Sequence, residues 1–306
     1  MRKVWFPLAL VLLAPLPAAA QILDRAAYTP PPYEKIQRAE LYSSKDEYRK
    51  ATEDMRFRLE KVAYKSGDLR VFAYVYAPAK PAGRMPAVIF NRGSFVWDDF
   101  GGHLLPAFHR FGQAGFAVIA PMYRGSGGGE GTDEMGGADL NDLMETARLA
   151  KDLGYIDTGN LFMMGESRGG MMAFQAIRDG FPIRAAAVFG AFTDLGSFLE
   201  STPQARAMAN GIWPDYAARK DEIHQRRSAV AWAEKMDVPL LILHGGADKS
   251  VSPSQALALA SKLESLGKPY ELVIRAGSNH VMTDWRAERD RHAIDWFRRH
   301  AAPRPR

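Results

Sequence analysis

The pentapeptide Gly165-Glu166-Ser167-Arg168-Gly169 constrains the fold of this chain more than any other part of the sequence. Residues 160–164 before it form an apolar run of the length of a buried strand, and residues 171–177 after it favour a helix. A serine between two such elements lies on a sharp turn, where a Cβ at either flanking glycine would collide with the neighbouring strand or helix. The serine itself takes a strained backbone conformation, which exposes its hydroxyl as a nucleophile.

Strands and helices alternate along most of the chain. A hairpin is expected over 57–77, and apolar runs of strand length follow at 87–90, 116–120, 161–164, 185–189, 240–243 and 272–274. Helical segments include 138–153, 167–179, 253–266 and 285–300. A strand-serine-helix turn within such an alternation is the nucleophile elbow of the α/β-hydrolases. We therefore predict an α/β-hydrolase fold with a mainly parallel central sheet and helices on both faces.

The connection after the sixth predicted strand is unusually long. It covers about residues 196–236 and contains Trp213, Pro214, Tyr216 and a charged stretch at 219–227. A connection of this length inside a compact domain is usually a lid or binding element with helices of its own. We therefore expect a lid insertion at this point of the fold.

The N-terminus has the pattern of a secretory signal peptide over residues 1–20. Arg2 and Lys3 precede an apolar stretch, and small residues end at Ala20. A retained membrane anchor is the alternative, but prolines interrupt the stretch and its apolar part is shorter than the ~20 residues of a spanning helix. We expect cleavage after Ala20, a periplasmic or secreted protein, and no stable membrane anchor in the mature chain. Residues 21–55 would then form an N-terminal extension with a surface helix or two, and residues 56–306 the catalytic domain.

The composition argues against several kinds of chemistry. The chain has no cysteine, which excludes disulfides, thiolate metal sites and a cysteine nucleophile. The glycine-rich stretch 125–131 lacks the lysine of a phosphate-binding loop, and residues 97–99 offer two carboxylates with no histidine at ligand spacing. The net charge of +5 is mild, and the basic run at 298–306 is interpreted as a solvated helix end and tail. We predict no metal, no cofactor and no nucleic-acid partner.

A nucleophilic serine needs a base, and the base needs an acid that orients it. Asp248 follows the strand at 240–243, and His280 follows the strand at 272–274. Both therefore fall at carboxyl ends of strands, on the same edge of the sheet as Ser167.

Other interpretations of these residues stay open at this stage. Asp248 could serve only as a turn residue before the next helix, and His280 could be a structural loop histidine. Asp194, after the preceding strand, is a competing acid. His244 is closest to Asp248 in sequence but lies in or near a buried strand end, so it is interpreted as a packed residue.

Several segments together resemble a known family. They are 120–128, which contains Tyr123-Arg124-Gly125, then 136–142, 165–170, 244–248 with Val251, and Asn279-His280. In these segments the sequence is similar to the prolyl-oligopeptidase-like serine hydrolases, over roughly residues 57–300. The resemblance implies an α/β-hydrolase fold with Ser167, Asp248 and His280 as the catalytic triad.

Two features depart from that family. Its large oligopeptidases carry a β-propeller before the hydrolase domain, whereas here residues 21–55 alone stand between the predicted signal peptide and the first predicted strand. The family often has a His-Gly-Gly-Pro or tyrosine-containing motif after its third strand, where this chain has Asn91-Arg92-Gly93-Ser94. One oxyanion-hole donor is expected to be the backbone N–H of Arg168, and the second the side chain of Asn91 or the backbone of Gly93. Asn91 as a simple turn former is the alternative.

These features predict an exported serine hydrolase that cleaves a peptide or ester bond of a small substrate through an acyl-enzyme. The resemblance favours a serine peptidase. A carboxylesterase acting on small acyl esters is the alternative, and a non-catalytic binding protein on the same scaffold is a further one. A dipeptidyl type of peptidase needs carboxylates to hold a free α-amine, and Glu34, Glu200 and Glu222 are candidates that nothing in the sequence separates. The substrate's identity and the oligomeric state are left open.

Overall fold

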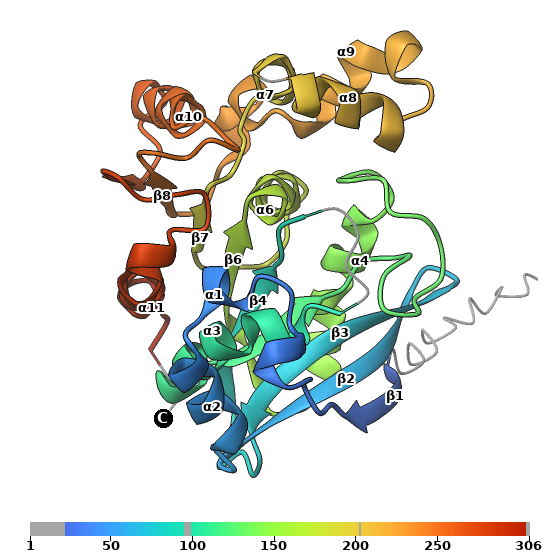
Figure 1. The fold of residues 1–306 in the computed structure, drawn as a ribbon, viewed down its shortest axis with the longest axis vertical. Coiled ribbons are helices and arrows are strands. Elements are labelled where there is room, and N and C mark those ends of the chain that lie inside the picture. The colour runs from blue at the N-terminus through green and yellow to red at the C-terminus, as the bar shows by residue number, and fades with distance from the viewer. Residues whose placement is uncertain (1–21, 95–98, 202, 304–306) are drawn as a thin grey trace, which may run out of the picture.

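The computed structural model describes residues 22–94, 99–201 and 203–303. The predicted signal peptide lies outside this part of the chain. Within it, one sheet has the strand order β1-β2-β3-β5-β4-β6-β7-β8-β9 (Figure 1). The strands are β1 (Ile22–Ala27), β2 (Phe57–Ser66), β3 (Leu69–Pro78), β4 (Met85–Asn91), β5 (Ala117–Pro121), β6 (Ile156–Glu166), β7 (Ala186–Phe189), β8 (Leu240–Gly245) and β9 (Tyr270–Arg275).

The first part of the sheet is antiparallel and the rest is parallel. β1, β2, β3 and β5 pair antiparallel in that order, while β5, β4, β6, β7, β8 and β9 pair in parallel. The parallel strands therefore have all their carboxyl ends at one edge, which is where ligands bind in sheets of this kind. This arrangement confirms the predicted mainly parallel α/β fold.

Helices cover both faces of the sheet. They are α1 (Ala39–Tyr42), α2 (Lys45–Glu53), α3 (Gly101–Gln113), α4 (Leu140–Met144), α5 (Thr146–Asp152), α6 (Arg168–Arg178), α7 (Leu195–Glu200), α8 (Pro203–Ile212), α9 (Tyr216–Arg227), α10 (Ser254–Ser265) and α11 (Arg286–Arg299). Short 3-10 helices lie at η1 (Tyr33–Lys35), η2 (Ala229–Ala231), η3 (Ala233–Lys235) and η4 (Thr283–Trp285). None of the helices in the described ranges is long and apolar enough to cross a membrane.

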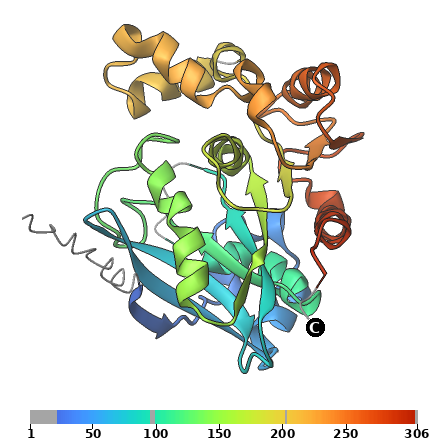
Figure 2. The same cartoon turned by 180° about the vertical axis from the view of Figure 1, so that it is seen from behind.

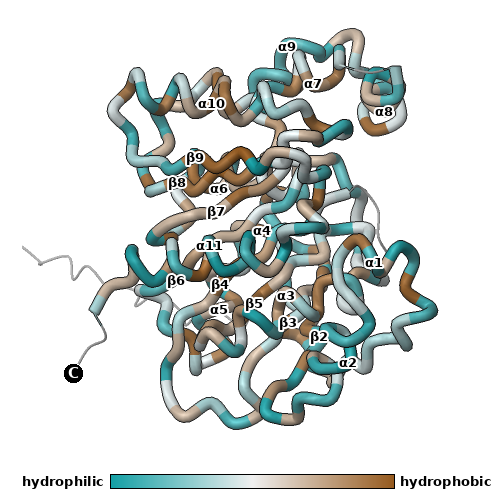
Figure 3. Tube along the Cα trace, turned by 60° about the vertical axis from the view of Figure 1, so that its left-hand side comes forward, coloured by the Kyte–Doolittle hydropathy of each residue, from teal (hydrophilic) through white to brown (hydrophobic). Residues whose placement is uncertain are grey.

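Two apolar clusters hold the helices against the sheet. Because side chains alternate along a strand, Val88 and Phe90 of β4 pack with α1, α2, α3 and α11, whereas Ala87 and Ile89 face α5, α6 and α10. Figures 1 and 2 show these two faces from opposite sides. In Figure 3 the traces of β8 and β9 are largely hydrophobic, whereas α9 at the far end of the molecule is largely hydrophilic. The sheet edge that carries the site is therefore fixed by packing on both sides.

The N-terminal segment differs from the prediction in one element. Helices α1 and α2 lie within the region where a surface helix or two was expected, but Ile22–Ala27 forms a strand, β1, which pairs with β2. Most residues of β1 are exposed, so the strand lacks the alternation of apolar residues that would indicate it in the sequence. As a consequence, the long helical insertion follows the seventh strand of the structure rather than the sixth.

Candidate active site

Ser167 stands at the tip of a sharp turn between β6 and α6. Its φ of 51° and ψ of −118° are unusual for a residue with a side chain. Both flanking positions require glycine, because a Cβ at either one would overlap with neighbouring backbone atoms. A Cβ on Gly165 would lie 2.7 Å from the carbonyl oxygen of Gly169, and a Cβ on Gly169 would lie 2.1 Å from that of Asn91. The turn is held to the neighbouring strand by the Ser167 N–H, which donates to the carbonyl of Phe189 at 2.9 Å.

Asp248 and His280 meet at the same edge of the sheet. Oδ2 of Asp248 lies 2.7 Å from Nδ1 of His280, and the Asp248 side chain is fully buried. The other carboxylate oxygen accepts from the backbone N–H groups of Ser250 at 2.8 Å and Val251 at 2.9 Å. Burial alone would raise the pKa of Asp248, but hydrogen bonds from His244, from His280 and from the Val251 N–H hold it well below its usual range. The carboxylate is therefore ionised and fixed in place beside the imidazole.

The structure also shows what the alternative residues do. Nε2 of His244 lies 2.9 Å from the Val251 carbonyl and 3.2 Å from Oδ2 of Asp248, so this buried histidine packs behind the carboxylate. The side chain of Asp194 accepts from the Ser197 N–H at 3.0 Å at the start of α7. Asp194 therefore acts as a helix cap.

A cavity of about 800 Å³ contains Ser167 and His280 in its lining. One of its walls comes from the N-terminal segment, in which residues between Pro31 and Tyr42 line the cavity. The described lining includes no residue of the helical insertion at 196–236, which the sequence predicts to be a lid. That insertion packs instead on the α6 side of the sheet, with Trp213 and Ile223 in the apolar cluster. The prediction of a lid role stays untested, and the N-terminal segment is the element that encloses the site.

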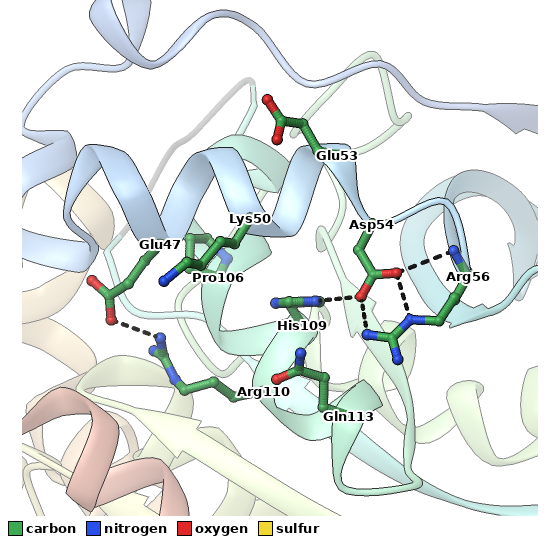
Figure 4. Close-up of a pocket in the computed structure, with 9 residues that line it drawn as sticks. All are labelled: Glu47, Lys50, Glu53, Asp54, Arg56, Pro106, His109, Arg110 and Gln113. Atoms are coloured by element: carbon green, nitrogen blue, oxygen red, sulfur yellow. Dashed lines mark hydrogen bonds and ion pairs between the residues drawn. The ribbon is translucent and has the colours of Figure 1, made fainter.

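Hydrogen bonds and ion pairs attach this wall to the rest of the domain. The Thr283 hydroxyl, three residues after His280, donates to the Leu41 carbonyl at 3.2 Å. In α2, Glu47 accepts from Arg110 of α3 at 3.3 Å and from Arg286 of α11 at 2.9 Å. Figure 4 shows the contact between Glu47 and Arg110 beside a second cavity of about 440 Å³, which residues of α2 and α3 line.

The carboxyl end of α2 is also attached to α3, through Asp54. Asp54 lies 2.9 Å from Nε2 of His109 and also accepts from the guanidinium of Arg56 at 2.6 Å (Figure 4). Both ends of α2 are therefore tied down. The wall of the Ser167 cavity is an integral part of the domain.

Two buried arginines hold the loop that follows β4. Arg92 donates to the carbonyls of Gly93 at 3.1 Å and Ser94 at 3.3 Å, and Arg168 donates to the Ser94 carbonyl at 3.2 Å. Their guanidinium groups lie over the Tyr123 ring, 5.0 and 4.7 Å from its centre. Burial and the neighbouring Arg168 lower the pKa of Arg92 to about 10, so it stays charged at neutral pH.

The loop geometry separates the predicted oxyanion-hole donors. The carbonyl of Gly93 points at Arg92, and since C=O and N–H of a trans peptide point in opposite directions, the Ser94 N–H points away from that guanidinium. Ser94 lines the cavity. By contrast, Asn91 is fully buried, and its Oδ1 accepts from the Tyr123 hydroxyl at 3.4 Å. Asn91 is absent from the described cavity lining, and its Nδ2 is buried with no hydrogen-bond partner among the described residues.

Among the cavity residues that the sequence does not predict as part of the site, two form a pair. Glu166 and Tyr42 both line the cavity, and their side chains are joined by a hydrogen bond of 3.5 Å from the Tyr42 hydroxyl to the carboxylate. Glu166 was visible as the residue before the nucleophile, but nothing in the sequence indicates which way its side chain turns. Tyr42 lies 124 positions away from it in the chain, and no local pattern predicts such a contact.

The fold and the elbow define the class of protein as an α/β-hydrolase. Residues 106–304 match the prolyl oligopeptidase family. The chain is 30% identical over 216 residues to an uncharacterized peptidase, YtmA, of Bacillus subtilis, which covers 70% of this chain and 82% of that protein. The chain belongs to the prolyl oligopeptidase family and is a hydrolase of the serine peptidase type.

Longer relatives share only this part of their length. The chain is 27% identical to dipeptidyl peptidase 8 of Mus musculus, over 69% of this chain and 25% of that protein. A puromycin-hydrolyzing peptidase of Mycobacterium tuberculosis superposes with a TM-score of 0.67 at 25% identity, over 78% of this chain and 38% of that one. An acylaminoacyl peptidase of Pyrococcus horikoshii has the same fold, with a TM-score of 0.66 at 18% identity, over 82% of this chain and 43% of that one.

Proposed function

We propose that Ser167, His280 and Asp248 form a catalytic triad that cleaves peptide bonds through an acyl-enzyme. The observation that carries the proposal is the 2.7 Å contact between a buried, ionised Asp248 and His280, in the lining of the cavity that also contains Ser167. Because Nδ1 of His280 is engaged with Asp248, Nε2 is the ring nitrogen left to exchange protons with the substrate and the serine.

The reaction follows from these positions. The Ser167 oxygen attacks the scissile carbonyl while His280 accepts the hydroxyl proton, and His280 then passes that proton to the leaving amine. Water, activated by His280, attacks the acyl-enzyme and restores Ser167. No hydrogen bond joins Ser167 to His280 in the described structure, and proton transfer requires the two side chains to approach to ~3 Å once substrate is bound.

Two backbone donors are proposed to stabilise the oxyanion. The first is the backbone N–H of Arg168, the residue directly after the nucleophile, at the start of α6. The second is an N–H of the Gly93–Ser94 loop, because the two arginines hold the carbonyls of that loop away from the cavity. Preorganised donors of this kind supply a large part of the rate in acyl transfer.

We further propose that the protein is exported, with cleavage after Ala20. The support is the charged, apolar and small-residue order of residues 1–20. Expression of the full chain in a bacterial host, cell fractionation and N-terminal sequencing test this proposal. A mature N-terminus at Gln21 in the periplasm or medium is the expected result, and an intact Met1 on a cytoplasmic protein would contradict it.

Labelling with a tagged fluorophosphonate tests the nucleophile. We expect the purified wild-type protein to be labelled and the Ser167→Ala variant to stay unlabelled. Ser250→Ala is the matched control, because Ser250 lines the same cavity and contributes only its backbone N–H to Asp248. Loss of labelling in the control, or retained labelling in Ser167→Ala, would contradict the assignment.

A substrate panel tests the type of bond. Aminoacyl and peptidyl anilides are compared with p-nitrophenyl esters of short acyl groups. The peptidase proposal expects turnover of the amides with a kcat/KM that depends on the acyl residue. Turnover of the esters alone would identify a carboxylesterase, and turnover of neither by a well-folded protein would favour the binding-protein alternative.

A further inference from the structure

Two carboxylates, Asp99 and Glu166, line the described part of the Ser167 cavity. Asp99 is fully engaged by the protein itself. Its oxygens accept hydrogen bonds from the Tyr28 hydroxyl, from the Tyr74 hydroxyl at 2.9 Å and from the Gly101 N–H at 3.0 Å. Asp99 therefore has a structural role.

Glu166 differs from Asp99, because its carboxylate has few hydrogen bonds and ion pairs with the described residues. Glu166 is 4% exposed, and among the described residues the one hydrogen bond to its side chain comes from the Tyr42 hydroxyl, at the long distance of 3.5 Å. No lysine, arginine or histidine nitrogen among the described residues forms an ion pair with it within 4 Å. Arg289 is the positive charge that acts most strongly on Glu166, but its guanidinium also pairs with Asp290 at 2.8 Å and donates to the Val281 carbonyl at 2.8 Å.

An acidic group in this position is costly to the free protein. Burial raises the pKa of Glu166, and Arg289 and His280 only partly oppose that effect. A buried carboxylate without an ion-pair partner is a destabilising feature, which a cationic group of the substrate would relieve. The residue lies directly before the nucleophile and faces the cavity in which the substrate must sit.

We propose that Glu166 binds the protonated amine of the substrate, so that the enzyme prefers acyl residues with a free α-amino group over N-acylated ones. The inference rests on the proposed role of Ser167 as nucleophile. The α-nitrogen is attached to the carbon next to the scissile carbonyl, so an amine held by residue 166 presents that carbonyl to residue 167. The Tyr42 hydroxyl, which also lines the cavity, donates to the same carboxylate.

The carboxylates that the sequence suggested as binding partners of a substrate amine do not lie at the described cavity. Glu34, Glu200 and Glu222 are all exposed, and none of them is in the described lining of the cavity. Glu34 is paired with Lys45, and Glu222 with Arg219 at 2.8 Å. The cations of the cavity, Lys35 and Arg38, are exposed on the N-terminal wall, where water screens them more strongly than it screens Glu166.

The test compares an aminoacyl p-nitroanilide with its N-acetyl derivative. Wild type should have the higher kcat/KM on the free amine, and Glu166→Gln should lower that ratio by ~30-fold or more, because one partner of a buried charge pair is lost. Glu166→Asp, which keeps the charge, should retain part of the preference. Glu264→Gln on α10 removes an exposed carboxylate far along the chain and should leave both substrates unchanged.

The outcomes separate this inference from the proposed function. If fluorophosphonate labels Ser167 but wild type prefers the N-acetyl substrate, the triad stands and the amine site is wrong. An equal loss on both substrates in Glu166→Gln would show a structural role only, and would also overturn the inference. Calorimetric binding of an aminoacyl amide to Ser167→Ala, with Glu166 and with Gln at 166, decides the question without turnover: weaker binding of the Gln variant supports the amine site, and equal binding rejects it.

Discussion

One contact of 2.7 Å joins Asp248 to His280, the residue that we propose as the base, so the proposed role of Asp248 can be tested directly. Asp248→Asn should keep the fold but lower kcat by ~10³-fold or more, since the amide stabilises neither the correct tautomer nor the imidazolium. Asp194→Asn is the control, because Asp194 caps α7 and should change kcat by no more than a few-fold. Steady-state kinetics of the two variants decides between the acids. A larger loss in Asp194→Asn would reverse the assignment.

A second prediction concerns the donors of the proposed oxyanion hole. If the Gly93–Ser94 backbone donates, Asn91→Ala should lower the melting temperature but leave kcat within a few-fold of wild type. If the Asn91 amide donates instead, kcat should fall by ~10²-fold or more. The measurement is kcat on one amide substrate, with the melting temperature recorded in parallel to separate folding from chemistry.

Individual residues differ in how far the sequence predicts them. Ser167, Asp248 and His280 were selected because each follows a strand of a parallel sheet, and strand ends of that kind share one edge. Glu166 was not selected, because the role that we propose for it depends on which positive charges do not pair with it. That property follows from the packing of Tyr42 and Arg289, which lie far from it in the sequence.

Helix α2 attaches the N-terminal wall of the cavity to the rest of the domain. Glu47 forms a capping box with Ser44, and it also forms ion pairs with Arg110 and Arg286. Glu47→Ala should destabilise the protein by ~1–2 kcal/mol and raise KM by loosening the wall. Glu53→Ala removes one exposed ion pair with Arg49 on the same helix and should do neither. Thermal unfolding and KM measured for both variants test this prediction.

The stability difference should also depend on pH. Burial raises the pKa of Glu47, but the Ser44 N–H and Arg286 outweigh it, so the folded-state pKa lies below its usual value. A depressed pKa contributes stability above the unfolded value of ~4.3, and that contribution is lost as pH falls through the folded value. The gap in melting temperature between wild type and Glu47→Ala should therefore be full at pH 7 and shrink below pH ~4. A gap that widens in acid would contradict this account.

Elements with a strong apolar pattern were predicted well. The runs at 87–90, 161–164 and 240–243 lie inside β4, β6 and β8, because a strand buried on both faces is apolar throughout. β1 was missed because its residues are mostly exposed and only pairing with β2 makes it a strand. The helical insertion was recognised by its length, but the surface on which it packs was not.

For the whole molecule, the cavity of about 800 Å³ sets the scale of the substrate. Pockets of ~300–1,000 Å³ hold ligands of drug-like size, which suits a short peptide. We expect the enzyme to cleave di- to tetrapeptides but not a stably folded protein. Mass spectrometry of the products measures this, with the Ser167→Ala variant as the negative control. Rapid degradation of a folded protein would show that the N-terminal wall opens widely.

The hydrogen bond between Leu41 and Thr283 has a consequence for the timing of activity. It joins the N-terminal wall of the cavity to the segment after His280 across 242 positions of the chain, so the wall is synthesised long before its partner. A growing chain carries Ser167 well before it carries His280. Contacts of such sequence separation form late in folding. Because we propose that His280 is the base, we expect a partly synthesised chain to lack hydrolase activity until the segment around His280 has been made and has joined the fold.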